Sequence, residues 1–551
     1  MLGFGDGTAQ TSWERRRIGP VYAERGMVAC EHLLMTSAGL DVLQRGGNAV
    51  DAAVAAAVVG SVVMPEMCGL GGDLFAIVYD PATGTTLSFL GSGISPRGAT
   101  IEQMRAGGED GKMPFRGPLA VGVPGMVDGY FALLNRFGSR PFVELAERAI
   151  GYAEQGHPVT TSLARFIGEY ASMLGSFDAS AATFLPGGQP PAPGQLLKQE
   201  SLGRTLRAIA DQGPDVVYRG DIAKRIIAAM TSAGGAMTLD DFAGHQTAVT
   251  PPIRTTYRGY TVYQTGIPSQ GLILLEALNV VEAAGTATVS PDDAWHHLLI
   301  EAKKLAYADR LGYAVDPAFG STPMDCLLSK EWARKRAAEI DPNSAAADVP
   351  AGEHSDGDTT YLCTVDGNGM MVSLIQSVSA AFGCGMVAGD TGVVLNNRVG
   401  RGFSLEPGHI NIFEPGKKTM HTLNCFMIGD GAGTPVLTGG TPGGDGQPQW
   451  NLQTITGMID FGLDVQAAIE APRWTSWPGT DPASLPNPFE VRVEDRLDDA
   501  IIAGLERRGH VVTRVGAWSG GGSSQVIVRD PSTGILAGGT DPRVEGTVAG
   551  F

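Results

Sequence analysis

The chain has 551 residues, of which 43% are hydrophobic and 18% charged, so it can bury a large core as one large fold or as two or three domains. Its formal net charge is -18, and no extended basic block provides the positive surface that binds nucleic-acid phosphates. The start of the chain lacks an apolar segment of secretory length, and no apolar run is long enough to cross a bilayer. We therefore expect a cytoplasmic protein with neither nucleic acid nor a membrane as partner.

The cysteines are widely spaced and form no Cys-x-x-Cys pair, which excludes the commonest zinc and redox motifs. We expect free, buried thiols at all six positions: Cys30, Cys68, Cys326, Cys363, Cys384 and Cys425.

The first predicted elements are two helices broken by Gly46-Gly47, with Asn48 as the N-cap of the second helix. The second helix is apolar on nearly all sides up to Val63, which predicts a buried helix that covers a sheet. The segment "LFAIVYDPATGTTLSFL" then predicts a strand, a turn at Pro81 to Gly84, and a second strand.

Helical patterns dominate the next part of the chain. Two helices are predicted to end at Gly156 and Gly213, since glycine suits a C-terminal cap, and a proline-rich loop separates them. A strand in "YRGYTVYQTG" precedes two longer helices, "GLILLEALNVVEAAG" and "AWHHLLIEAKKLAYADRLGY". This region is therefore mixed helix and sheet.

A small, polar and acidic stretch at about residues 343–358 predicts a linker. The chain after it consists mainly of alternating apolar segments and glycine turns with few helices, so we predict a mostly β region from residue 359 to the end.

Common cofactor and nucleophile motifs are absent, including the P-loop, His-Glu-x-x-His and Gly-x-Ser-x-Gly. His296-His297 is a poor metal pair, because adjacent helical residues point in different directions. We expect neither a metal nor a cofactor.

The linker ends at Asp358-Thr359-Thr360, which leads into the hairpin "YLCTV", "DGNG", "MMVSLIQSV". A three-residue loop at Gly367 to Gly369 places Thr359 opposite Ser377, whereas a two-residue loop places Gln376 there.

Thr359 has two interpretations. A β-branched residue often simply begins a strand. Cleavage in front of it would instead expose an α-amino group with a pKa of about 7.7 to 8.0, which can act as base for the threonine's own hydroxyl. The backbone N–H groups of Gly443 and Gly444 are candidate oxyanion donors for such a nucleophile, because no side chain blocks the approach of a substrate, although the local pattern by itself favours a plain glycine turn.

The chain resembles the gamma-glutamyltranspeptidases and their acylase relatives, which are N-terminal-nucleophile hydrolases. The similar segments occur in the same order over nearly the whole chain: "GGNAVDAAVA", "CGLGGDLF", "AVGVPGMVDG", "YRGYTVY", "PSQG", "EAKKLAYADR", "DTTYLCTVD", "FGCGMVAGDTGVVLNNR", "TPGGDGQPQ", "APRW" and "DPRVEG".

The resemblance implies an α+β fold with four αββα layers and self-cleavage between Asp358 and Thr359. The two fragments, residues 1–358 and 359–551, would then build one active site and act on a small-molecule amide. The resemblance also implies that Thr359 forms an acyl-enzyme, that Ser377 lies near its amino group, and that Gly443 and Gly444 form the oxyanion hole. A dimer of the cleaved pair is a further possibility.

Substrate-binding positions depart from the transpeptidase pattern. Ser92 replaces the arginine that pairs with the glutamyl carboxylate, and Gly402 replaces an aspartate. Each lost charge-assisted bond removes roughly 1.5 to 3 kcal/mol. Ser379 occupies the position of the family's asparagine, and His421-Thr422 that of its serine pair. Arg398 and Arg401 are candidates for a replacement anion site or for structural roles.

These departures favour the acylase and oxamate amidohydrolase-like branch. Our first hypothesis is a self-processing amidase that uses an N-terminal threonine on a small acyl amide, with water as the main acceptor. The alternatives are a true gamma-glutamyltransferase or glutathione hydrolase, and an uncleaved binding protein without catalysis.

Overall fold

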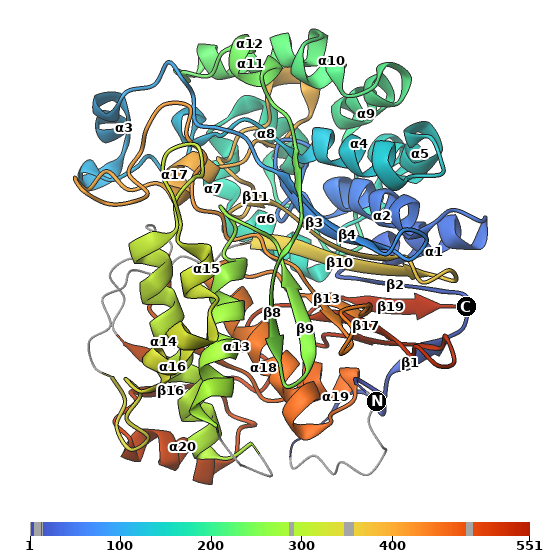
Figure 1. Cartoon of the computed structure of the whole chain (residues 1–551). Coiled ribbons are helices and arrows are strands. Elements are labelled where there is room, and N and C mark those ends of the chain that lie inside the picture. Colours follow the sequence, from blue (N-terminus) through green and yellow to red (C-terminus); the bar gives the residue numbers. More distant parts are fainter. Residues whose placement is uncertain (1, 5–12, 14, 286–290, 347–357, 481–488) are drawn as a thin grey trace.

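A computed structural model describes residues 2–4, 13, 15–285, 291–346, 358–480 and 489–551. Two seven-stranded sheets lie face to face at its centre, and helices cover the outer face of each sheet (Figure 1). The predicted αββα arrangement is therefore present, with an α+β distribution of helices and strands.

The first sheet takes strands from both sides of residue 358. In spatial order its strands are β1 (Val21–Ala23), β18 (Leu536–Thr540), β17 (Gln525–Arg529), β13 (Pro435–Gly440), β12 (Phe426–Gly429), β9 (Tyr260–Gln264) and β8 (Ile253–Tyr257).

The second sheet is also built from both parts of the chain. Its order is β19 (Thr547–Gly550), β2 (Gly26–Cys30), β10 (Asp358–Asp366), β11 (Met371–Ser379), β3 (Asp73–Asp80), β4 (Thr85–Gly91) and β7 (Ala248–Thr250). All neighbouring strands in it are antiparallel, and β10 lies between β2 and β11.

Alternate residues of the second sheet point in opposite directions, which assigns them to two different cores. Tyr361 and Cys363 of β10 pack between the two sheets, whereas Leu362 packs against the helices outside. Residues of β10 at odd positions, Thr359 included, therefore face the first sheet.

The helical layer on the second sheet contains the predicted all-apolar helix. This is α2 (Ala49–Val63), every residue of which is buried, and Asn48 caps it as expected through a reciprocal pair of bonds with Asp51. Helices α1 (Leu33–Gln44), α4 (Met126–Phe137) and α5 (Phe142–Gln155) pack against it. The same layer also contains α9 (Glu200–Gln212), α10 (Asp215–Tyr218), α11 (Asp221–Ser232) and α12 (Leu239–Ala243).

The helices on the first sheet include α13 (Gly271–Ala284) and α14 (Asp293–Tyr313), which were both predicted. The others are α15 (Met324–Leu327), α16 (Lys330–Ala337), α18 (Gln447–Phe461), α19 (Val465–Glu470) and α20 (Asp499–Arg507). Helix α18 was not expected, because its apolar residues follow a glycine-rich segment that predicts only a turn.

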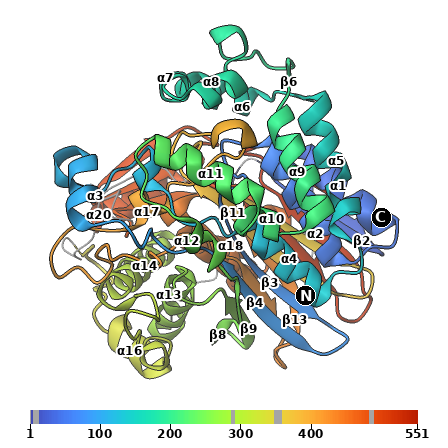
Figure 2. The same cartoon turned by 90° about the horizontal axis from the view of Figure 1, so that it is seen from above.

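Smaller elements complete the fold. Helices α6 (Thr161–Glu169), α7 (Ala171–Gly175) and α8 (Asp178–Phe184) lie at one edge of the molecule, where they pack against Val378 of β11 and the segment after it (Figure 2). The remaining named elements are α3 (Ile101–Gly107), α17 (Arg398–Gly402), the strand pair β5 (His157–Pro158) and β6 (Leu196–Leu197), and the three-stranded sheet of β14 (Trp474–Trp477), β15 (Glu490–Glu494) and β16 (Val512–Val515).

The structure tests the expectations about the six cysteines and about membrane-spanning segments. All six cysteines are free thiols, but Cys326 is exposed on the short helix α15, so burial holds for five of them. Among the described residues, no helix has both the length and the apolar character needed to cross a membrane.

Candidate active site

The hairpin of β10 and β11 has the three-residue loop that the sequence left open. Asp366 N–H donates to the Met370 carbonyl at 3.1 Å, and Gly369 has a φ of 88° in the loop between them. The Asp366 carboxylate also accepts hydrogen bonds from two backbone N–H groups beyond it, those of Asn368 and Met370. An Asx-type turn therefore fixes the loop and with it the register of the two strands.

This register brings Thr359 to Ser377. Thr360 pairs with Gln376, and the register shifts between Asp358 and Thr360 so that Asp358 pairs with Ser379. The Thr359 Oγ1 lies 3.2 Å from the Ser377 Oγ, and both side chains are buried. The predicted linker is largely outside the described residues, since 347–357 are not described, and Asp358 continues directly into Thr359 as part of β10.

The Ser377 hydroxyl also holds the strand end in place. It accepts a hydrogen bond from Ser379 N–H at 2.7 Å. Ser379 has a φ of 88°, a left-handed conformation that costs a non-glycine residue of order 1 kcal/mol or more. Arg401 donates to the Ser379 carbonyl at 2.6 Å and so supports this conformation.

Asp73 is a site residue that the sequence reasoning missed. It begins β3 and pairs with Ser377 of β11, so its side chain lies on the same face of the sheet as those of Ser377 and Thr359. Its Oδ2 accepts a bond from Arg398 Nε at 3.1 Å and lies 3.0 Å from His421 Nε2. The "GGD" within "CGLGGDLF" was the available signal, because an acidic residue at the start of a buried strand needs a partner.

The hydrogen bonds of His421 determine which of its two ring nitrogens carries the hydrogen. Leu423 N–H donates to Nδ1 at 3.2 Å, so Nδ1 carries the lone pair and Nε2 carries the hydrogen that is donated to Asp73. Burial and the positive charge of Arg398 lower the pKa of His421 to about 3. Burial alone would raise the pKa of Asp73, but the hydrogen bond from His421 and the charge of Arg398 hold it below its usual value. The group is thus a neutral imidazole beside a carboxylate–guanidinium pair.

The two predicted oxyanion glycines follow β13. Gly443 has a φ of 120° and Gly444 a φ of 52°. A side chain at Gly443 is excluded, because its Cβ would lie 2.1 Å from Cζ3 of Trp450. The neighbours of the Gln447 amide favour the orientation with its oxygen toward the loop, and in that orientation the oxygen accepts from Gly444 N–H at 3.3 Å.

Of the remaining predicted substrate residues, Thr422 and Ser92 lie near the Asp73–Arg398 pair. Thr422 Oγ1 accepts from Arg398 Nη1 at 3.3 Å. Ser92 follows Gly91, which pairs with Leu74 next to Asp73. The hydroxyls of Ser92 and Ser379 are buried and have no hydrogen-bond partner among the described residues.

Gly402 has a structural reason to lack a side chain. A Cβ there would lie 2.3 Å from Thr419 Oγ1, so the aspartate found at this place in the transpeptidase pattern does not fit this backbone.

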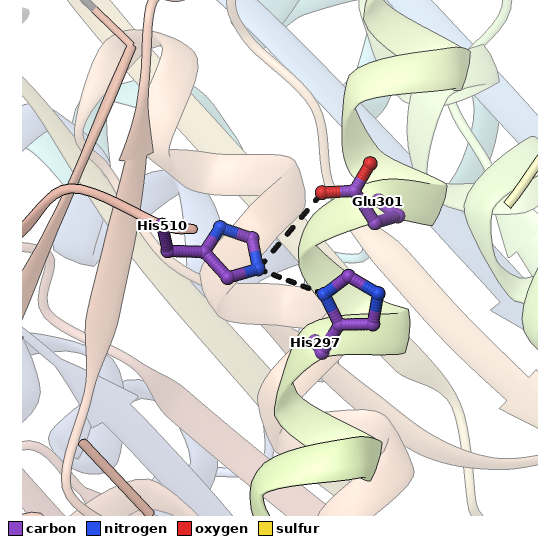
Figure 3. A group of neighbouring side chains, drawn as sticks. All are labelled: His297, Glu301 and His510. Carbon is purple, nitrogen blue, oxygen red and sulfur yellow. Dashed lines mark hydrogen bonds and ion pairs between the residues drawn. The ribbon is translucent and has the colours of Figure 1, made fainter. Parts of the chain in front are cut away.

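A second group of titratable side chains lies between α14 and the segment after α20 (Figure 3). His297 Nδ1 is 2.8 Å from His510 Nε2, and His510 Nε2 is 3.9 Å from Glu301 Oε1. The Lys304 ammonium already binds Glu301 Oε1 at 2.7 Å, so a cation occupies the oxygen that a metal ion would need. We assign this group to the packing of α14 against the segment after α20.

The two facing sheets with helices on both outer faces define the αββα fold of the N-terminal-nucleophile hydrolases. The crystal structure of cephalosporin acylase from Bacillus halodurans is 37% identical and superposes with a TM-score of 0.89, covering 98% of each chain. The family model described as gamma-glutamyltranspeptidase matches residues 35–551.

The sequence relatives agree with this assignment. The glutathione hydrolase-like YwrD proenzyme of Bacillus subtilis (strain 168) is 37% identical over 96% of this chain and 99% of its own length. The oxamate amidohydrolase proenzyme of Klebsiella pneumoniae is 36% identical over 96% of this chain and 98% of its own length. The chain belongs to the gamma-glutamyltranspeptidase family and is an amide hydrolase of that family.

Proposed function

We propose that the chain is a proenzyme that cuts itself between Asp358 and Thr359, and that Thr359 then hydrolyses a small acyl amide through an acyl-enzyme. The observation that carries the proposal is the 3.2 Å contact between the hydroxyls of Thr359 and Ser377 at the start of β10. Relatives named as proenzymes support the cleavage step.

Self-cleavage would begin when Thr359 Oγ1 attacks the Asp358 carbonyl carbon. The bond from this carbon to the Thr359 nitrogen breaks, the nitrogen takes up a proton, and an ester links Asp358 to the threonine oxygen. Water then hydrolyses the ester and releases residue 358 as a carboxylate. The Ser377 hydroxyl is placed to accept a hydrogen bond from the threonine hydroxyl at the start of this sequence.

In the mature enzyme the freed α-amino group, with an unperturbed pKa of about 7.7 to 8.0, would remove the hydroxyl proton. The oxygen attacks the substrate amide, and the developing oxyanion takes over the Gly444 N–H that Gln447 otherwise accepts. The amine leaves with a proton, and water resolves the acyl-enzyme.

Three features favour an acyl group other than γ-glutamyl. Ser92 offers a hydroxyl instead of a guanidinium, and the Gly402 backbone has no room for an aspartate. Arg398 is the candidate replacement cation, and it is already paired with Asp73 at 3.1 Å. A relative named oxamate amidohydrolase and a structural neighbour named cephalosporin acylase support this choice of branch.

The first experiment follows purified protein on a denaturing gel with N-terminal sequencing. We expect two bands and a new N-terminus at Thr359, and a Thr359→Ala variant that stays whole. A wild-type chain that never splits would overturn the proposal in favour of an uncleaved binding protein.

A second experiment separates the substrate classes. Initial rates with γ-glutamyl-p-nitroanilide are compared with those for glutaryl-p-nitroanilide, butyryl-p-nitroanilide and oxamate. Turnover of the γ-glutamyl compound above all others would assign the enzyme to transpeptidase chemistry.

A further inference from the structure

Gln270 joins two loops of the candidate site from outside that site. It directly precedes α13, in the part of the chain before the proposed cut, and its side chain is fully buried. Its Nε2 donates to the carbonyl of Thr422 and, at 2.7 Å, to the carbonyl of Gly444. One side-chain amide therefore binds both the loop that contains His421 and Thr422 (the His421 loop) and the loop that contains Gly443 and Gly444 (the glycine loop).

The backbone strengthens the same link. Gln270 N–H donates to the His421 carbonyl at 2.9 Å, and His421 N–H donates back to the Pro268 carbonyl at 2.8 Å. These bonds form a short parallel bridge between Ser269 and His421. The segment before α13 is therefore rigidly attached to the loop that contributes His421 and Thr422.

Arg310 determines which way the Gln270 amide points. Its Nη1 lies 3.2 Å from Gln270 Oε1, and because arginine only donates, the oxygen faces Arg310 and the NH2 group faces the two carbonyls. The guanidinium is buried and also contacts Asp445 Oδ1 at 3.4 Å, the Thr480 hydroxyl and the His421 carbonyl.

These bonds restrain the peptide planes on both sides of Gly444. The Gly443 carbonyl accepts from Gly446 N–H at 2.8 Å, and the Gly444 carbonyl accepts from Gln270. The Gly444 N–H lies in the same planar peptide unit as the Gly443 carbonyl, and the Gly444 carbonyl lies in the next one. Holding both carbonyls therefore limits rotation about Gly444 and keeps its N–H in one direction. Glycine would otherwise sample many conformations at this position.

We propose that Gln270 is a positioning residue, whose amide clamps the glycine loop to the His421 loop and aims the Gly444 N–H at the reacting carbonyl. This inference rests on the proposed function, in which Gly444 supplies an oxyanion donor. Two donors and one acceptor are needed at this position, and among side chains of this length only glutamine provides them.

The test is Gln270→Glu, which keeps the shape but replaces the donors with carboxylate oxygens that face two carbonyls. We expect kcat to fall about 100-fold, as on loss of one oxyanion donor, with KM changed less than about threefold. The activity relative to wild type should rise as the pH falls, because protonation of the introduced carboxylate would restore one donor. The substrate is whichever p-nitroanilide wild type hydrolyses fastest.

Gln453 provides a matched control. Its Nε2 also donates to two carbonyls, those of Gln449 and Trp474, and its Oε1 also accepts a hydrogen bond. Gln453→Glu should therefore cost stability without the fall in kcat.

Two outcomes would overturn the inference alone while wild type is active: a Gln270→Glu enzyme with wild-type kcat, or equal falls in kcat for both glutamate variants. A wild-type chain that neither cuts itself nor hydrolyses any amide would instead overturn the proposed function and this inference with it.

Discussion

The hydroxyl of Thr359 lies 3.2 Å from that of Ser377, on neighbouring strands whose register is fixed by a turn at Asp366. This geometry places a hydrogen-bond partner beside the proposed nucleophile before any cleavage occurs. The contact is buried, so water does not compete strongly for either hydroxyl.

We predict that Ser377→Ala slows self-cleavage by about 10- to 100-fold, because the Thr359 hydroxyl loses its acceptor and Ser379 N–H loses its bond. The rate is measured from the fraction of uncut chain on denaturing gels over time. Ser88→Ala is the control, since Ser88 is also a buried strand serine but has no hydrogen-bond partner among the described residues. Cleavage of the Ser377 variant at the wild-type rate would contradict the role of this contact.

Local features could be predicted from the sequence, but the contacts of Asp73 with Arg398 and His421 could not. The N-cap at Asn48 and the loop after Asp366, which sets the Thr359–Ser377 register, depend on residues within a few positions of each other. Asp73 meets Arg398 and His421 across 325 and 348 residues of chain. Such contacts arise from sheet order and loop packing, which no local pattern encodes.

The same limit applies to the glycines. The sequence explained Gly443 by close approach of a substrate, whereas the structure shows an indole ring against it. Gln270 and Arg310 were visible in "PSQG" and "EAKKLAYADR", but only the fold shows that they bind one another.

The Asp73–Arg398 pair predicts a change in acyl preference. In Asp73→Asn the guanidinium keeps its charge but loses this counter-ion, so it should bind a substrate carboxylate more strongly. We expect the kcat/KM ratio for glutaryl- over butyryl-p-nitroanilide to rise at least about tenfold, and the unfolding free energy to fall by about 3 kcal/mol.

Asp541→Asn is the control for this prediction. Asp541 forms a buried pair with Arg473 at 2.8 Å instead of binding residues of the site. It should lose comparable stability and leave the glutaryl-to-butyryl ratio unchanged. An unchanged ratio in Asp73→Asn would mean that Arg398 does not contact the acyl group.

Gly443→Ala should be harmful for a steric reason. The new Cβ would lie 2.1 Å from Cζ3 of Trp450, in a residue whose φ is 120°. We expect a loss of about 2 to 4 kcal/mol from overpacking and backbone strain together, measured by urea unfolding in a Thr359→Ala background. Gly408→Ala, with a φ of 84° and open space around the Cβ, should show only the backbone cost. Equal losses in the two variants would contradict the role of Trp450.

His296 gives a pH-dependent prediction that does not involve the site. Trp474 Nε1–H donates to His296 Nδ1 at 3.1 Å, and burial lowers the pKa of His296 to about 3. The unfolded chain, with a histidine pKa of about 6.5, therefore binds more protons between these values. The stability provided by the neutral imidazole is complete above pH 6.5 and is lost as the pH falls toward 3, by about 1.4 kcal/mol per pH unit.

The test compares His296→Gln with its parent, both in a Thr359→Ala background, by urea unfolding followed by tryptophan fluorescence. Between pH 7.5 and 5.5 the unfolding free energy of His296→Gln should fall by about 1.4 kcal/mol less than that of the parent. Equal losses in both chains would show that His296 accepts a proton in the folded state.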